Sequence, residues 1–198
     1  MKPRDFQIDL QKKLSGIYEV QEAGAIAARY LTDRFGLSTT QLLLNEELPL
    51  TTEEEAKIDG DVQQLLAHVP VQQVVGFELF CGHRFKVNGD TLIPRPETED
   101  LVQLATEKCC GALSNILDVG TGSGCIAISL AKALPLARVA AWDISEGALQ
   151  VAQENATTLG ARVDFELRDL LKEADVPTLA PQSLDAIVSN PPYIPEEE

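Results

Sequence analysis

The strongest chemical signal in this sequence is a turn that could bind a planar amino group. Asn190-Pro191-Pro192-Tyr193 follows the apolar run 184–189, which is typical of a buried strand. Each proline fixes its own φ, lacks an N–H and restricts the residue before it, so the backbone carbonyls of the turn stay free as acceptors. The Asn190 side-chain oxygen adds an acceptor and Tyr193 adds a flat face, which together suit a planar –NH2 group. The tetrapeptide alone is equally compatible with a proline-rich loop that ends a strand.

A glycine-rich loop forms the second motif. The apolar run 116–119, which contains Asp118, is followed by Gly120-Thr121-Gly122-Ser123-Gly124 and then by the helix-forming segment 125–134. Glycines let the backbone turn sharply and approach a ligand, and the N–H groups at the start of a helix face whatever binds there. The spacing is G-x-G-x-G rather than the G-x-G-x-x-G of dinucleotide sites, so the loop alone predicts a nucleotide or nucleoside of unspecified kind.

An acidic residue follows the next predicted strand. The strand 139–142 leads into Asp143, which lies 19 residues after Gly124. In βαβ nucleotide sites, an acid about 20 residues beyond the glycines accepts hydrogen bonds from ribose hydroxyls. The alternative is an acid that stabilises the start of helix 146–159, for which Ser145 is a suitable N-cap. The glycine loop that precedes Asp143 favours ribose binding.

A second acid, Asp169, follows the predicted strand 163–167 and Arg168. Its carboxylate could accept a hydrogen bond from an adenine amino group. An acid in a solvated loop is the alternative, and the residues alone leave both interpretations open.

Taken in order along the chain, these motifs resemble those of class I S-adenosylmethionine-dependent methyltransferases. The resemblance rests on 118–124, Asp143, Asp169 and Asn190-Pro191-Pro192-Tyr193. It implies an α/β fold with a Rossmann-like sheet, and S-adenosyl-L-methionine as the cofactor. The cofactor-binding residues that it implies are Asp118, Gly120, Thr121, Gly122, Gly124, Asp143, Asp169 and Asn190. The Asn-Pro-Pro-Tyr version implies methylation of a planar nitrogen, such as adenine N6, guanine N2 or the side-chain amide of glutamine.

A further segment narrows the resemblance to the HemK-type release-factor glutamine methyltransferases. Leu92-Ile93-Pro94-Arg95-Pro96-Glu97-Thr98-Glu99 resembles the signature of that family, and 74–80, 85–87 and 194–195 also fit. The family implies methyl transfer from S-adenosyl-L-methionine to the amide nitrogen of a glutamine in the Gly-Gly-Gln loop of a peptide chain release factor. Locally, the same segment predicts the start of a helix, with Pro96 in the first helical position and acids in the first turn.

The resemblance assigns the chemistry to the turn after strand 184–189. The catalytic residues that it implies are Asn190, Pro191 and Tyr193, and Pro192 joins them in binding the substrate. The Asn190 oxygen and the Pro191 carbonyl would accept both amide hydrogens, while Tyr193 would pack against the amide plane. A sulfonium is already a good leaving group, so no metal is required, and the site must hold nitrogen, methyl and sulfur in line. No residue is evident as a strong general base.

The net charge bears on the choice of substrate. It is −15 for 198 residues, and residues 71–198 alone carry 9 Lys and Arg against 19 Asp and Glu. Nucleic-acid binding normally needs a basic surface, so methylation of adenine or guanine in DNA or RNA is disfavoured, although a local basic groove would restore it. A protein substrate with a basic loop would be attracted to an acidic surface. A ribosomal-protein glutamine methyltransferase remains an alternative that differs only in its protein substrate.

The first 70 residues have a different pattern. Apolar residues repeat at helical spacing within 6–17, 20–35 and 58–69. Two possible capping boxes, Ser38-x-x-Gln41 and Thr52-x-x-Glu55, predict further helix starts. The region 1–70 is therefore expected to be a small helical bundle with the apolar stripes in its core. The family resemblance implies that this domain helps to grip the release factor.

Residues 71–91 are expected to link the bundle to a methyltransferase domain at 92–198. Within this linker, 78–80 and 84–87 predict a β-hairpin with His83 in the turn. Members of the family continue through further strands, so we expect the first four parallel strands of the sheet here and not the later ones. The strand 184–189 would then have an open edge, which favours self-association, weak cofactor binding and poor activity. An inactive fragment of such an enzyme is the corresponding alternative.

Composition agrees with a cytoplasmic enzyme. Hydrophobic residues make up 44% of the chain. No apolar run approaches the roughly 18 residues that predict a membrane span, and the N-terminus lacks the apolar core of a signal peptide. Because no such apolar run is present, no membrane partner is expected. The cysteines have no C-x-x-C spacing and are expected to be reduced thiols, so no metal site is expected. They are Cys81, Cys109, Cys110 and Cys125.

Overall fold

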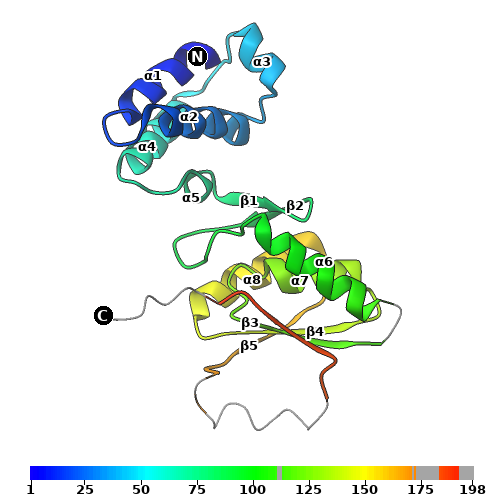
Figure 1. Cartoon of the computed structure of the whole chain (residues 1–198). Helices are drawn as coiled ribbons and strands as arrows, with labels where there is room; N and C mark the ends of the chain where they lie inside the picture. The colour runs from blue at the N-terminus through cyan, green and yellow to red at the C-terminus, as the bar shows by residue number, and fades with distance from the viewer. Residues whose placement is uncertain (111–112, 171, 173–182, 192–198) are drawn as a thin grey trace. The chain divides into compact units, whose positions relative to one another are not determined.

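A computed structural model of the chain describes residues 1–110, 113–170, 172 and 183–191. The chain divides into two compact units, Met1–Gly76 and Phe77–Glu198 (Figure 1). This division differs from the expected linker at 71–91. Helix α5 (Val71–Val75) belongs to the first unit, because its Val71 is buried in the core of the helices that precede it. The hairpin belongs to the second unit.

The first unit is helical, as the sequence predicts. Its helices are α1 (Pro3–Leu14), α2 (Val20–Phe35), α3 (Thr39–Leu44), α4 (Thr52–Leu66) and α5. Helices α1 and α2 pack along each other, and α4 packs against α1. The core that they enclose consists of Leu10, Leu14, Ala23, Ala27, Tyr30, Leu31, Ile58, Val62, Leu65 and Val71.

The predicted helix boundaries of this unit are close to the observed ones. Helix α2 ends at Gly36, whose φ of 65° is the left-handed conformation that glycine adopts readily. The capping box of Ser38 with Gln41 is present at the start of α3. The box expected at Thr52 and Glu55 is wrong by one residue. Thr51 is the N-cap of α4, because its Oγ1 accepts from the Glu54 N–H and the Glu54 carboxylate accepts from the Thr51 N–H.

A buried polar contact joins α2 to α4 inside this core. The Tyr30 hydroxyl, which is fully buried, donates to Asp61 Oδ2 at 2.9 Å, and Arg34 Nε donates to the same oxygen at 3.2 Å. Burial, together with the neighbouring Asp61 carboxylate, raises the pKa of Tyr30 well above its usual value. The hydroxyl therefore stays a donor at neutral pH, and the buried carboxylate has two donors to balance its desolvation.

We expect Tyr30→Phe to lower the stability of the first unit. The substitution keeps the ring in the core but removes one donor from a buried carboxylate, which costs about 1.5–3 kcal/mol. The free energy of unfolding is measured by urea titration followed by far-UV circular dichroism. Tyr18→Phe is the control, since Tyr18 is only partly buried and contacts the His68 ring edge-on. Equal stability of the two variants would contradict a stabilising role of the Tyr30–Asp61 contact.

The second unit begins with the predicted β-hairpin. Strands β1 (Phe77–Phe80) and β2 (His83–Lys86) pair antiparallel, with Phe80 opposite His83. His83 is thus the first residue of β2, and its expected place in the turn is wrong, because the turn closes over Cys81 and Gly82 alone. The Phe80 and Phe85 rings pack edge-on, with their centroids 6.0 Å apart, and are buried in the core of the second unit.

The centre of the second unit is a parallel sheet. Among the described residues it contains four strands in the order β5-β4-β3-β6. Their bounds are β3 (Asn115–Val119), β4 (Arg138–Asp143), β5 (Asp164–Leu167) and β6 (Ala186–Ser189). Three helices lie on one face of the sheet (Figure 1), namely α6 (Glu97–Cys109), α7 (Cys125–Ala133) and α8 (Glu146–Leu159). This is the predicted α/β arrangement.

Strand β6 is less buried than its apolar sequence suggests. Val188 points into the core and is 5% exposed, whereas Ile187 is 64% exposed. Successive side chains of a strand point to opposite faces, so one face of β6 is covered and the other is not in the described part of the chain. Within that part, β6 pairs with β3 alone and lies at the edge of the sheet.

The described helices do not include one that combines the length and the apolar character of a membrane span.

Candidate functional site

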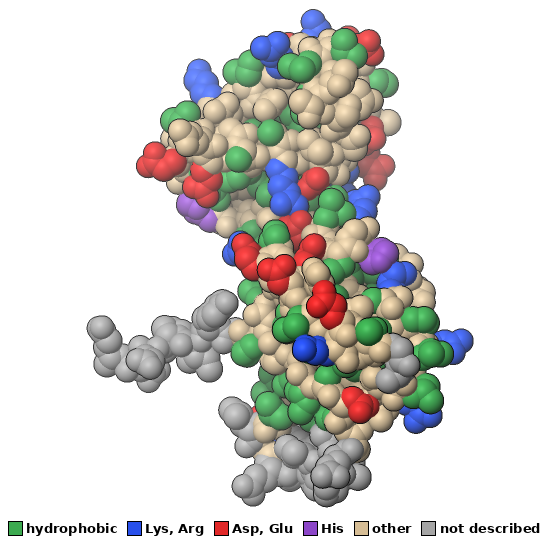
Figure 2. Space-filling view, turned by 45° about the vertical axis from the view of Figure 1, so that its right-hand side comes forward, with side chains coloured by type: hydrophobic (Ala, Val, Ile, Leu, Met, Phe, Trp, Pro, Cys, Tyr) green, Lys and Arg blue, Asp and Glu red, His purple; other side chains and the backbone are tan. Residues whose placement is uncertain are grey.

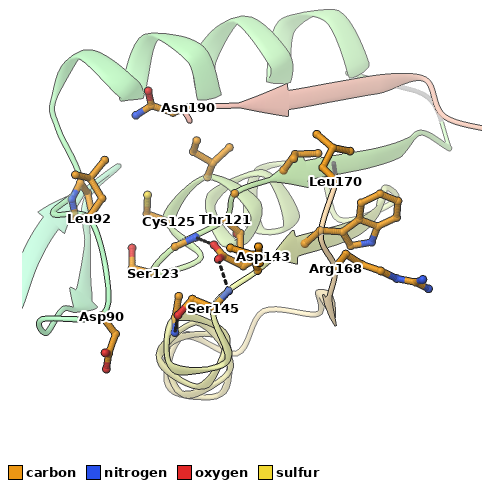
Figure 3. A pocket seen from close by; sticks show the side chains of 18 of the residues that line it. Asp90, Leu92, Thr121, Ser123, Cys125, Asp143, Ser145, Arg168, Leu170 and Asn190 are labelled. Atoms are coloured by element: carbon orange, nitrogen blue, oxygen red, sulfur yellow. Dashed lines mark hydrogen bonds between the residues drawn. The ribbon is translucent and has the colours of Figure 1, made fainter. Parts of the chain in front are cut away.

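A cavity of about 390 Å³ lies at the carboxyl edge of the parallel sheet. Figure 3 shows Asn190 and Asp143 on opposite sides of it, with Leu92 and Leu170 on the two remaining sides. The predicted site residues that line it are Gly120, Thr121, Gly122, Asp143, Asp169 and Asn190. The sheet therefore brings together motifs that lie up to 70 residues apart in sequence, from Gly120 to Asn190.

The glycine loop has the open backbone that ligand binding needs. Gly122 has a φ of 55°, and a Cβ added there would meet nothing within 4 Å. Gly124 has a different role, because its added Cβ would lie 2.9 Å from Ile128 Cδ1 and 3.0 Å from Ala152 Cβ. Gly122 thus leaves space in the cavity, while Gly124 allows α7 and α8 to pack closely and does not line the cavity.

Asp143 contacts both the glycine loop and the residue that caps α8. Its Oδ2 accepts from the Gly122 N–H at 2.8 Å and its Oδ1 accepts from the Ser145 N–H at 2.9 Å (Figure 3, dashed lines). Ser145 caps α8 by accepting from the Ala148 N–H at 3.2 Å. Each carboxylate oxygen has a second acceptor position. Asp143 can therefore stabilise the loop and still accept hydrogen bonds from a ligand in the cavity.

Asp169 lines the cavity on the side of β5, and its side chain is 18% exposed. Its Oδ2 lies 3.3 Å from Lys172 Nζ. The guanidinium of the preceding residue, Arg168, lies 2.7 Å from the Glu166 carboxylate, measured from Nη2 to Oε2. Its Cζ lies 5.8 Å from the centroid of the Trp142 ring. Asp169 is thus placed to contact a ligand, and its role toward adenine stays a prediction.

Asn190 directly follows β6, and its Nδ2 donates to Thr98 Oγ1 at 3.1 Å. Thr98 belongs to the segment 92–99 that the sequence singled out, and Leu92, Ile93 and Pro94 of the same segment also line the cavity. Pro191 follows directly. Pro192 and Tyr193 lie outside the described residues, so their predicted contacts with substrate stay predictions.

Comparison with known proteins identifies the family. Residues 98–198 match the family model described as the methyltransferase small domain, and residues 9–76 match the PrmC N-terminal domain. The chain belongs to the methyltransferase small domain family. The Rossmann-like fold and the resemblance to the release-factor glutamine methyltransferases that the sequence suggested are both confirmed.

Curated relatives of this chain carry the description "Release factor glutamine methyltransferase". The relative from Bacteroides thetaiotaomicron is 38% identical over 96% of this chain and 66% of its own length. Those from Enterococcus faecalis and Bacillus subtilis are 42% and 44% identical, over 93% and 82% of this chain and 65% and 57% of their own lengths. The chain thus spans less than two thirds of the length of these relatives.

Among solved structures, a partial likeness extends to the crystal structure of Pyrococcus abyssi tRNA (uracil-54, C5)-methyltransferase in complex with S-adenosyl-L-homocysteine. The TM-score is 0.46 and the sequence identity is 21%, and the match covers 59% of this chain and 28% of that one.

Asp118 lies beneath the glycine loop rather than in the cavity wall. It is fully buried, and its Oδ2 accepts from Thr121 Oγ1 at 2.7 Å and from the Ala127 N–H at 3.2 Å. Within the described part of the chain, Oδ1 has no hydrogen-bond partner. Burial, with a smaller contribution from the charge of Asp143, raises the pKa of Asp118 to about 6. Asp118 therefore joins the loop to the start of α7.

The sequence did not identify Asn155, which positions the same loop from α8. Asn155 is 2% exposed; its Oδ1 accepts from the Lys86 N–H at 2.7 Å, and its Nδ2 donates to the carbonyls of Lys86 and Ser123 at 3.0 and 2.9 Å. The available signal was one amide on the otherwise apolar face of α8. That face consists of Ala148, Leu149, Val151, Ala152 and Ala156.

The four cysteines are free thiols, as expected. Among the described residues, His, Cys, Asp and Glu side chains do not form a group that could hold a metal ion.

We expect Asp118→Asn to change the pH dependence of stability. Because the folded pKa is raised, native Asp118 binds a proton between about pH 4 and pH 6, where the unfolded residue is ionised. The contribution of this proton to the free energy of unfolding is fully present below pH 4 and is lost as the pH rises through 6. It amounts to at most about 3 kcal/mol. Relative to wild type, the variant should therefore gain stability between pH 4 and pH 7. Urea unfolding followed by the fluorescence of Trp142 measures this difference.

Asp164→Asn is the matched control for this measurement, since Asp164 is an exposed acid in strand β5 of the same sheet. Subtracting its pH curve removes effects that come from the loss of any one carboxylate in this sheet, and the gain of Asp118→Asn should remain after the subtraction. Parallel pH curves for Asp118→Asn and wild type would show that the buried carboxyl does not titrate in this range.

Proposed function

We propose that this protein transfers a methyl group from S-adenosyl-L-methionine to the side-chain amide nitrogen of a glutamine in a peptide chain release factor. One observation carries the proposal. Asn190 of the Asn-Pro-Pro-Tyr motif lines the same cavity as the glycine loop and Asp143. The residues that we propose to hold the cofactor and the residue that we propose to hold the planar amide line one cavity, which supports methyl transfer between them.

The residues around the cavity fit S-adenosyl-L-methionine. The space beside Gly122 is open, so a ligand can approach the backbone of the loop. Trp142 Nε1 is a buried polar atom of a lining residue without a hydrogen-bond partner in the described part of the chain, and such an atom calls for a polar partner. The carboxylates of Asp143 and Asp169 suit a cofactor with cationic groups and ribose hydroxyls. When bound, the cofactor supplies a methyl group that is activated by the sulfonium sulfur, which departs as a neutral thioether.

The protein would contribute position and electrostatics. The lone pair of an amide nitrogen is delocalised, so the nucleophile is poor and must be held in line with the methyl group. The Asn190 side-chain oxygen and the Pro191 carbonyl would accept its two hydrogens and stabilise the positive charge that builds on nitrogen. Pro192 would fix the turn, and Tyr193 would pack against the amide plane. Each of these roles is part of the proposal.

A release factor is the partner that the charge distribution favours. The net charge is −15, and on the face that Figure 2 shows, the Lys and Arg side chains of the described residues are scattered rather than gathered in a continuous stripe. Such a surface suits a basic protein loop better than a phosphate backbone. We propose that the helical first unit helps to bind the release factor. A partner in translation places the reaction in the cytoplasm.

Mass spectrometry of a release factor incubated with this protein and S-adenosyl-L-methionine tests the proposal. One added methyl group on the glutamine of the Gly-Gly-Gln peptide is the expected result. Methylation of a ribosomal protein instead would leave the chemistry intact and change the partner. Methylation of adenine or guanine in added nucleic acid, with an unchanged release factor, would overturn the proposed substrate class.

We expect Asp143→Ala to weaken cofactor binding. Each charged hydrogen bond lost from the ribose hydroxyls costs about 1.5–3 kcal/mol, and the Gly122 and Ser145 N–H groups also lose their acceptor. Isothermal titration calorimetry measures the affinity. Asp143→Asn retains an acceptor oxygen and should lose less. Wild-type affinity in Asp143→Ala would remove this residue from the site, and binding of NADH without S-adenosyl-L-methionine would change the class of cofactor.

Asn190→Ala should separate cofactor binding from chemistry. The cofactor affinity is expected to stay close to that of wild type, because most of the polar groups proposed to bind it come from other residues. The rate of methyl transfer is expected to fall by roughly 10²–10³, as it does when one preorganised polar group is removed elsewhere. Transfer at the wild-type rate would contradict the role of Asn190 as the amide acceptor.

A further inference from the structure

Two residues far apart in sequence meet at the side of the cavity nearest α6. Thr98 lies in the first turn of α6, and Asn190 follows the last residue of β6. The 3.1 Å hydrogen bond from Asn190 Nδ2 to Thr98 Oγ1 connects them, and both residues line the cavity. No role was predicted for Thr98 beyond its place in the segment 92–99.

Thr98 is held firmly enough to position another residue. Its side chain is buried, with 8% of the residue exposed, and its N–H donates to the Arg95 carbonyl at 3.0 Å. The next residue, Glu99, accepts from the Cys81 N–H through its Oε1 at 2.8 Å. The start of α6 is thus bonded to the turn of the β-hairpin, and the Thr98 hydroxyl has a defined place.

The backbone at Asn190 is also fixed, but its carboxamide is not fixed by the backbone. Ser189 pairs with Val119 in the sheet, and its Oγ donates to the Val119 carbonyl at 2.7 Å. The terminal torsion of an asparagine side chain is nevertheless broad and nearly two-fold, so nitrogen and oxygen can exchange places. A hydrogen bond to one end of the group can hold the carboxamide in one of these two orientations.

We propose that Thr98 is a positioning residue that sets the orientation of the Asn190 carboxamide. In this proposal the Thr98 hydroxyl, which can donate as well as accept, acts as the acceptor of the pair, so it engages the Asn190 –NH2 group and leaves the oxygen end as the acceptor for the substrate amide. The inference rests on the proposed function, because the acceptor role of Asn190 belongs to it. In the reverse orientation the –NH2 group would be available in place of the oxygen, and it would repel the amide hydrogens of the substrate.

The test uses three substitutions in the protein and measures methyl transfer to the release factor at saturating cofactor. Thr98→Val keeps the shape of the side chain and removes the hydroxyl, whereas Thr98→Ser keeps the hydroxyl. Thr106→Val is the matched control, since Thr106 lies on the same helix and its Oγ1 bonds to the Val102 carbonyl away from the cavity. Of the three variants, we expect only Thr98→Val to lower kcat, by about tenfold, which is the size expected for one lost orienting hydrogen bond. The KM for the cofactor should not change.

A double mutant distinguishes positioning from general support of the fold. If Thr98 acts through Asn190, Thr98→Val should have no further effect on kcat in the Asn190→Ala background. Equal tenfold losses in both backgrounds, or wild-type kcat in Thr98→Val, would overturn the inference while leaving the proposed function standing. Failure of Thr98→Ser to restore kcat would also overturn it.

A second readout does not depend on activity. The side-chain amide resonances of Asn190 in the isotope-labelled protein should shift in Thr98→Val and stay in place in Thr98→Ser and Thr106→Val. If wild type methylates no glutamine, the proposed function fails and these resonances alone decide whether the contact exists. Unchanged Asn190 resonances in Thr98→Val would refute it.

Discussion

The parallel pairing of β4, β3 and β6 is the constraint on which the whole site depends. Parallel strands end at the same edge of a sheet, and ligands of open α/β sheets bind outside that edge. Val119 lies opposite both Trp142 and Ser189. Gly120, Asp143 and Asn190 therefore lie at the same level, one residue beyond this pairing, and Asp143 is the last residue of β4. A slip of one residue would turn every side chain of a strand to the other face and separate these groups.

Buried polar side chains then fix the loop that the strands bring to this edge. The three consecutive loop residues 121–123 are each hydrogen-bonded to a different element. Asp118 of β3 accepts from the first, Asp143 of β4 accepts from the second, and Asn155 of α8 donates to the third. Hydrogen bonds in a buried setting are strong, and an unpaired partner there is costly. The loop conformation is thus determined by the packing of α8 and the sheet as well as by its glycines.

Much of this arrangement could be predicted because its signals are local. A glycine loop between an apolar run and helix formers, an acid after the next strand and a serine before α8 all describe backbone geometry within a few residues. The errors are of two kinds. The N-cap at Thr51 and the strand position of His83 differ by one residue, because neighbouring residues of similar type compete for the same role. The exposure of Ile187 was missed because strand composition does not reveal which face is covered.

The contacts made by Thr98 and Asn155 could not be predicted, since they join residues far apart in sequence. The Thr98–Asn190 bond spans 92 residues and the Asn155–Lys86 bonds span 69. A threonine at a helix start and an asparagine within a helix have ordinary local explanations. Only the way in which the sheet places α6 beside β6, and α8 beside the hairpin, gives these side chains their partners.

The electrostatics of the cavity distinguish it from other glycine-loop sites. Such loops commonly receive a phosphate, because helix N–H groups and the helix dipole favour an anion. Here Asp90, Asp143 and Asp169 line the cavity, and Asp118 lies buried beneath the loop. An added anion would be repelled by these carboxylates, and Asp143 already contributes to the raised pKa of Asp118. A cationic ligand would relieve that repulsion and favour the ionised form of Asp118. The carboxylates that are costly in the free protein therefore favour a ligand with a cationic group over an added anion at this edge of the sheet.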